Sequence, residues 1–97
     1  MCTVPKITQE RTDILIYDDS LHDEYIRVLV DELPSLRARI HLSQADLARG
    51  VGISRQTYSL IETQKQKMTW VTFMAIIAFF SGDPKTRQAL IRLKLFD

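Results

Sequence analysis

The sequence has one cysteine, Cys2, and therefore cannot form an internal disulfide. A chain without structural disulfides is typical of a reducing compartment, so we expect a cytoplasmic protein. No positively charged start leads into an apolar stretch with a small-residue cleavage site, and we identify no secretory signal. The longest apolar run, residues 71–80, contains Thr72 and is about half of the ~20 residues that a membrane-spanning helix needs. This run predicts a buried helix.

The patterns of catalysis and metal binding are also missing. There is no Ser/His/Asp constellation, Gly-rich phosphate loop or nucleophile motif, so we expect no enzyme activity. The two histidines, His22 and His41, are far apart and have no clustered cysteine or acidic ligands at metal spacing. The acidic residues in the range 18–24 are explained more simply by helix capping. We therefore expect no metal and no cofactor.

The charge balance is close to neutral, but the charges are unevenly distributed. The net charge of +1 indicates no particular partner. Residues 1–32 hold three basic and eight acidic side chains, whereas residues 36–68 hold six basic and two acidic ones. An acidic segment beside a basic centre is the asymmetry expected of a small DNA-binding chain. Charge clusters are usually only solvated faces, so this distribution needs a motif to support it.

The length of 97 residues and the 45% of hydrophobic residues suit one compact domain. Over residues 1–19 we predict an N-terminal arm or a short strand, because residues 14–17 are a β-prone apolar run. This run could also pack on a neighbour. Over residues 20–97 we predict a single helical domain.

Within that domain, caps and prolines mark the expected helix boundaries. Ser20 and Asp23 form a capping-box pattern, and apolar residues follow at helical spacing. Pro34 fits the first position of a helix better than its interior, so we predict a break near Leu33 and a second helix over about 34–41. The remaining predicted helices begin at Ser43, at Ser54 (ending near Gln64), at Thr69 (ending at Phe80) and at Pro84 (ending near Phe96).

The stretch 43–62, SQADLARGVGISRQTYSLIE, has the spacing of a helix-turn-helix. Two helices that meet at about 90–120° need a small residue where they touch and a glycine in the turn. Ala48 and Gly52 supply these, and Gly50 and Gly52 bound the predicted turn. The apolar residues spaced to point into the shared core are Leu47, Val51, Ile53, Tyr58 and Ile61. The second helix also has a polar face with groups suited to base edges, formed by Arg55, Gln56, Ser59 and Thr63.

These features resemble the Cro/repressor-type (XRE) helix-turn-helix family of DNA-binding proteins. The resemblance covers residues 36–80 and rests on Leu36-Arg37, Ser43-Gln44, Leu47-Ala48, Val51-Gly52, Ser54-Arg55-Gln56 and Ile61-Glu62. It implies an all-α fold, a lambda-repressor-like helix-turn-helix bundle of about five helices with an N-terminal extension and the motif at 43–64. It also implies a structural pair between Arg37 and Glu62 and a phosphate contact from Gln44. Arg55, Gln56 and Ser59 would then face the bases.

The chain departs from the family pattern at two positions. Many members have a glycine after the glutamate of the recognition helix, where this chain has Thr63, so the following loop turns differently or the helix extends further. Tyr58 occupies a position that is more often a β-branched aliphatic residue. We expect Tyr58 in the core, with its hydroxyl needing a partner or solvent.

The chemistry of the motif predicts sequence-specific binding of double-stranded DNA. Arginine can bond guanine and glutamine adenine through two hydrogen bonds. Thr57 and Ser59 can donate to bases or phosphates, while Lys65, Lys67 and the helix N-termini can meet phosphates. We therefore predict a small transcription regulator, a repressor, with residues 54–64 in the major groove. The candidate DNA-binding residues are Ser43, Gln44, Arg55, Gln56, Thr57, Ser59, Thr63, Lys65 and Lys67.

The apolar helix and the acidic segment raise the question of protein partners. In the helix, Trp70, Phe73, Met74, Ile77 and Phe80 can fill the core, while Val71, Ile76 and Phe79 lie on other faces. A homodimer contact would cover these faces and would suit binding to two half-sites. Two alternatives stay open at this point. One is an antitoxin or protein-interaction module whose acidic N-terminal segment binds a partner, and the other is a structural helix-turn-helix that never touches DNA.

Overall fold

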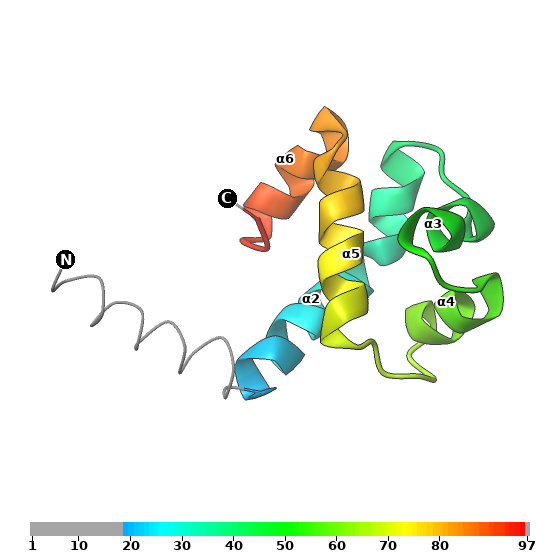
Figure 1. Cartoon of the computed structure of the whole chain (residues 1–97). Coiled ribbons are helices and arrows are strands. Elements are labelled where there is room, and N and C mark those ends of the chain that lie inside the picture. The colour runs from blue at the N-terminus through cyan, green and yellow to red at the C-terminus, as the bar shows by residue number, and fades with distance from the viewer. Residues whose placement is uncertain (1–18, 97) are drawn as a thin grey trace, which may run out of the picture.

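The computed structural model describes residues 19–96, which form five helices and no strand (Figure 1). The helices are α2 (Asp19–Arg39), α3 (Gln44–Val51), α4 (Arg55–Glu62), α5 (Trp70–Ser81) and α6 (Pro84–Arg92). The prediction of an all-α bundle of about five helices is confirmed. The arm or strand predicted over residues 1–19 lies outside the described residues, except for Asp19 at the start of α2. None of the helices in this range combines the length and the apolar character that a bilayer span requires.

Helix α2 continues through Pro34, so the predicted break near Leu33 is wrong. A proline in a helix interior removes one backbone hydrogen bond and costs roughly 3 kcal/mol relative to alanine. The proline side chain is exposed, whereas Leu29, Leu33 and Leu36 are buried along one face of the helix. The burial of this leucine face on both sides of Pro34 holds the two halves in one helix, because packing of an apolar face supplies most helix stability.

The later helices begin at the predicted capping residues. The side chains of Ser43, Ser54 and Thr69 each accept a hydrogen bond from the backbone N–H three residues further on. Asp83 caps α6 by accepting a hydrogen bond from the N–H of Lys85, and Pro84 is the first residue of that helix. Other boundaries differ from expectation, and α4 ends at Glu62 and not near Gln64. Ser20 lies inside α2 and is not its N-cap, and α6 ends at Arg92 because Lys94 adopts a positive φ of 64°.

Helix α5 is the centre of the bundle and contacts α2, α3 and α6 (Figure 1). The buried side chains of α5 are Phe73, Ile76, Ile77 and Phe80. Met74, which was expected in the core, is 56% exposed, and Ile76, which was expected on another face, is fully buried. Phe79 is half-buried. Of the three residues expected to need cover from a second chain, only Val71 is largely exposed, at 78%.

Candidate nucleic-acid interface

The turn between α3 and α4 is fixed by Gly52. Its φ of 85° lies in the left-handed region that glycine adopts without steric cost. The N–H groups of Gly52 and Ile53 both donate to the carbonyl of Ala48, at 2.9 and 3.0 Å. Gly50, which was expected to bound the turn, belongs to α3 instead. The turn is therefore shorter than the sequence suggested, and Gly52 ends the first helix of the motif.

Gly50 has a different role, which the sequence pattern did not predict. A Cβ atom at this position would overlap the ring of Phe79 and lie only 2.9 Å from its Cδ1 atom. The glycine therefore lets α3 approach α5 closely, with the aromatic ring against its backbone. The sequence did contain one indication of this role. A glycine inside a helix costs about 1 kcal/mol of stability relative to alanine, and its presence there usually has a packing reason.

The inner sides of the two motif helices form part of the core. Leu47 and Ala48 of α3 and Tyr58 and Ile61 of α4 are all buried, in agreement with the predicted shared core. The other two predicted core residues of the motif, Val51 and Ile53, are partly buried and pack against the same cluster. Because the inner sides are buried in this way, the opposite side of α4 faces solvent.

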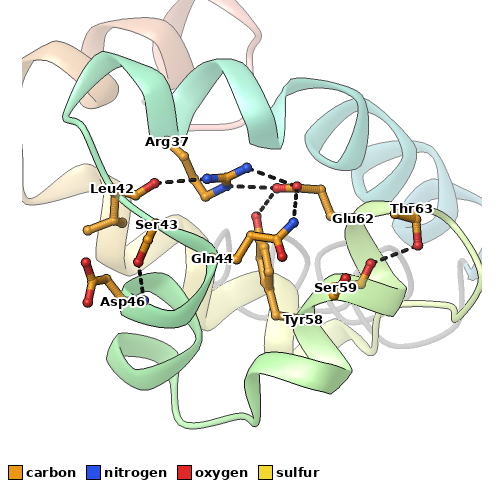
Figure 2. A network of polar contacts seen from close by, with 9 residues as sticks. All are labelled: Arg37, Leu42, Ser43, Gln44, Asp46, Tyr58, Ser59, Glu62 and Thr63. Atoms are coloured by element: carbon orange, nitrogen blue, oxygen red, sulfur yellow. Dashed lines mark hydrogen bonds and ion pairs between the residues drawn. The ribbon is translucent and has the colours of Figure 1, made fainter.

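Glu62, the last residue of α4, accepts hydrogen bonds from side chains of three helices (Figure 2). Arg37 of α2 donates to both of its oxygens, from Nε to Oε2 at 2.9 Å and from Nη2 to Oε1 at 3.0 Å. Gln44 of α3 donates from Nε2 to Oε1 at 2.7 Å, and the hydroxyl of Tyr58 donates to Oε2 at 2.5 Å. Arg37 also donates to the carbonyl of Leu42 at 2.9 Å, which fixes the chain just before the motif.

This cluster is shielded from water. The side chains of Arg37 and Glu62 are 18% and 7% exposed. Burial opposes the ionisation of Glu62, but the hydrogen bonds from Arg37, Tyr58 and Gln44 outweigh it and lower the pKa of this carboxyl. Burial and the bond to Glu62 raise the pKa of the Tyr58 hydroxyl, which therefore stays a donor at neutral pH. The expected need of Tyr58 for a partner is met by Glu62.

The outward side of α4 carries the candidate base-reading residues. Arg55 and Gln56 are exposed, and neither forms a side-chain hydrogen bond or ion pair within the described part of the chain. Thr57 and Ser59 are half-buried. The hydroxyl of Thr57 accepts from Ser54 at 2.9 Å. Arg55 and Gln56 are thus the candidates whose side chains can turn toward a ligand without breaking a contact.

The candidates at the ends of the motif have contacts inside the protein. Ser43 is exposed and caps α3, while Gln44 is half-buried and bonded to Glu62. The Thr63 hydroxyl donates to the carbonyl of Ser59 at 2.8 Å (Figure 2). The family resemblance implied a phosphate contact from Gln44, and its bond to Glu62 holds the amide group at the N-terminus of α3. That placement suits an anion near the positive end of a helix.

The loop after α4 turns sharply and presents two lysines. Gln64 has a φ of 63°, in the left-handed region that glycine adopts most readily. The helix does not extend further, because Thr63 is its C-cap. Lys65 and Lys67 are exposed, but the Nζ of Lys67 lies 2.8 Å from Oδ1 of Asp23 on α2. This ion pair places a carboxylate beside one of the two expected phosphate contacts.

The described part of the chain contains no group of three or more His, Cys, Asp or Glu residues placed to hold a metal ion. The candidate interface consists instead of the exposed polar side of α4, the N-terminus of α3 and the lysine-containing loop. Helices α3 and α4 lie side by side (Figure 1).

Comparison with known families agrees with this geometry. A family model described as helix-turn-helix matches residues 35–84, which is 50 of the 97 residues and just over half of the chain. The match begins in the second half of α2 and ends at the first residue of α6, so it includes the motif and the whole of α5. No curated protein and no solved structure matches the chain. The chain belongs to the Cro/repressor-type (XRE) helix-turn-helix family and is a DNA-binding helix-turn-helix regulator.

Proposed function

We propose that this protein is a sequence-specific transcriptional repressor that inserts α4 into the major groove of double-stranded DNA. The observation that carries the proposal is the division of α4 into two sides. Tyr58, Ile61 and Glu62 attach the helix to the scaffold, while Arg55 and Gln56 are exposed and unbonded. A helix held rigidly along one side, with donors along the other, is the arrangement that reading base edges requires.

The proposed contacts fall into two classes. Arg55 and Gln56 read bases, since each can form two hydrogen bonds to one base edge. Ser59 and Thr57, which have shorter side chains, donate to bases or phosphates beside them. Contacts to phosphates position the helix without reading sequence, and the candidates for this role are Ser43, Gln44, Thr63, Lys65 and Lys67.

We further propose that the protein binds DNA as a homodimer. Helix α4 has only eight residues, so one copy can read only a short half-site. Two copies of such a module bind half-sites whose centres are about 34–36 Å apart. Light scattering of the free protein and of the complex tests this directly, and a single copy on the selected DNA would contradict the proposal.

The function itself is tested by selecting bound sequences from random double-stranded DNA with the full chain. We expect a defined, palindromic consensus. Failure to enrich any sequence would contradict sequence-specific binding. Placing the selected site over a promoter then tests repression, and unchanged or increased expression would contradict the role as a repressor. Co-purification of a second protein that abolishes DNA binding would favour the protein-interaction module instead.

The residue roles are tested with single alanine variants on the selected site and on random DNA. Gln56→Ala should weaken binding to the selected site by about 5- to 150-fold. This corresponds to roughly 1–3 kcal/mol, the contribution expected of one bidentate contact to a base. Its binding to random DNA should change little. Gln66→Ala is the matched control, because Gln66 is also exposed but lies beyond α4. Equal losses for Gln56→Ala on both DNAs would assign Gln56 to the phosphates.

A further inference from the structure

The outward side of α4 is not entirely polar. Leu60 is 38% exposed, whereas Ile61, the next residue, is buried in the core. The exposed large apolar side chains elsewhere in residues 19–96 are Val71 and Met74 on α5 and Ile91 on α6. Single exposed apolar side chains are common on protein surfaces. Leu60 differs from the other three because it lies on the helix that carries the proposed base-reading residues.

Leu60 lies on the same side of α4 as Gln56. Residues four apart in an α-helix share one face and are separated by a rise of about 6 Å, so the two side chains are neighbours along the helix. Tyr58 and Glu62 are each two residues from Leu60 and therefore lie on roughly the opposite side of the helix axis. These two residues are hydrogen-bonded to each other and belong to the cluster that attaches α4 to α2 and α3. Leu60 therefore faces away from the scaffold.

The backbone at Leu60 is fixed by the loop that follows the helix. Its carbonyl accepts hydrogen bonds from the N–H groups of Lys65 and Gln66, at 2.8 and 3.2 Å. The hydroxyl of Thr63 also donates to this carbonyl, at 3.3 Å. Leucine loses less side-chain freedom on burial than glutamine or lysine does. An apolar contact made from this position therefore requires little additional ordering of the chain.

We propose that Leu60 recognises a thymine by packing against its C5-methyl group, an inference that rests on the proposed insertion of α4 into the major groove. The base edges in that groove present hydrogen-bond donors and acceptors, and the thymine methyl is the apolar group among them. The Leu60 side chain has no donor or acceptor. Packing it against the amino or carbonyl group of a base would leave that group without a partner, which is unfavourable. The methyl group is therefore the feature of a base edge that Leu60 complements.

The proposed contact divides the outward side of α4 by chemistry. Arg55 and Gln56, in its first turn, offer hydrogen bonds suited to guanine and adenine. Leu60, one turn after Gln56, offers an apolar surface suited to thymine. Cytosine presents an amino group and no methyl group in the major groove, so the contact discriminates between the two pyrimidines. Each half-site should therefore contain one thymine whose methyl group contributes to binding.

Deoxyuridine, which is thymidine without the C5-methyl group, tests the proposal on the sequence selected from random DNA. Each thymine of a half-site is replaced in turn, and binding of the full chain is titrated. At one thymine, loss of the methyl group should weaken binding of the unmodified protein by about 4-fold, the effect of removing one methyl-sized group from an apolar contact. Leu60→Ala should bind the thymine DNA more weakly than the unmodified protein and show no further loss on deoxyuridine at that position.

Two further variants separate this contact from a structural effect. Leu60→Met retains an apolar side chain of similar size and should keep the sensitivity to deoxyuridine. Ile91→Ala is the matched control, because Ile91 is 39% exposed but lies on α6. The control variant should lose as much affinity on deoxyuridine as the unmodified protein does.

The outcomes separate the contact from the proposed function. A selected half-site without thymine, or one in which no thymine methyl group affects binding, would overturn the role of Leu60. A Leu60→Ala protein that keeps the full effect of the methyl group would do the same. All of these results leave sequence-specific binding in place, because they require a selected consensus. Failure to select any consensus would overturn the proposed function itself, and the contact from Leu60 with it.

Discussion

At the scale of single residues, Glu62 ties three helices together through one carboxylate. Its partners Arg37, Gln44 and Tyr58 belong to α2, α3 and α4, so loss of the charge affects the whole motif. Removing one member of a buried ion pair typically costs about 3–5 kcal/mol, because the remaining charge is left buried without a partner. Arg37 keeps some contact with solvent, which places the expected cost near the lower end of this range.

We predict that Glu62→Gln removes an acid-sensitive part of the stability. The pKa of Glu62 is lowered in the folded state, so its contribution is fully present above the unfolded value of about 4.3. This contribution is lost as the pH falls through the folded value. Urea unfolding at pH 7 and pH 3 should therefore show a large difference in unfolding free energy between the two proteins at pH 7 and a smaller one at pH 3.

The matched control is Glu24→Gln. Glu24 pairs with Arg27 at 2.8 Å, but both side chains are more than half exposed. Exposed pairs contribute about 0–1 kcal/mol, so this variant should unfold nearly as the unmodified protein does at pH 7. A Glu62→Gln effect that is the same at both pH values would contradict the assigned role of the charge.

Gln64 offers a second prediction at this scale. A residue with a side chain in the left-handed conformation pays roughly 1–2 kcal/mol, and glycine avoids most of this cost. We expect Gln64→Gly to raise the unfolding free energy by about 0.5–1 kcal/mol in thermal or urea unfolding, after the extra chain entropy of glycine is counted. Gln66→Gly is the control, since Gln66 has no positive φ and should not be stabilised by the change.

At the scale of elements, the approach of α3 to α5 depends on Gly50. Alanine usually stabilises a helix interior relative to glycine by about 1 kcal/mol. Here the added methyl group would overlap the Phe79 ring, so we predict that Gly50→Ala lowers the unfolding free energy by about 1–2 kcal/mol. Gly82→Ala is the control, because its Cβ would meet no atom closer than 3.4 Å and its φ is negative. Thermal unfolding of both variants measures the difference, and a stabilised Gly50→Ala protein would refute the close approach.

The same scale shows which parts of the fold could be predicted. Helix starts at Ser43, Ser54 and Thr69 were predictable because a cap is a local interaction between residues three apart. The continuity of α2 through Pro34 was not, because it depends on the burial of leucines against helices that are distant in sequence. The role of Gly50 likewise depends on Phe79, which lies in α5. Local signals thus fixed the boundaries, and tertiary packing decided the exceptions.

The candidate site divides in a similar way. The polar side of α4 was predictable from helical spacing, and its Arg55 and Gln56 are exposed as expected, although their DNA contacts remain predictions. The bond of Tyr58 to Glu62 joins residues four apart on α4, which helical spacing brings together. The bond of Gln44 to Glu62 and the pairing of Lys67 with Asp23 could not be derived from spacing, because each joins residues on different elements.

At the scale of the whole molecule, the uneven charge distribution reaches the proposed DNA-binding surface. Asp23, in the acidic part of the sequence, pairs with Lys67 in the basic part at 2.8 Å. Both side chains are largely exposed, so the pair contributes only about 0–1 kcal/mol and can exchange for a phosphate contact. If Lys67 contacts a phosphate as proposed, the carboxylate of Asp23 competes with DNA for this lysine.

We predict that Asp23→Asn strengthens binding to all DNA sequences alike, by a few-fold at low salt. If Lys67 meets a phosphate, the slope of log affinity against log salt should steepen by up to about 0.9. Titrations at several salt concentrations measure both effects. Glu24→Gln is again the matched control. It removes an equal charge at the residue next to Asp23, but Glu24 pairs with Arg27 and not with Lys67. Equal gains in DNA affinity for the two variants would show that Asp23 acts only through general repulsion between its negative charge and the DNA.

The exposed, unbonded state of Arg55 and Gln56 has a consequence for how such a regulator can diverge. Surface substitutions away from caps and packed contacts usually change stability by no more than about 0.5 kcal/mol. The two positions that would choose the operator can therefore vary almost independently of the residues that keep the chain folded. Duplicated copies of this scaffold could acquire new target sites through one or two codon changes, without passing through an unstable intermediate.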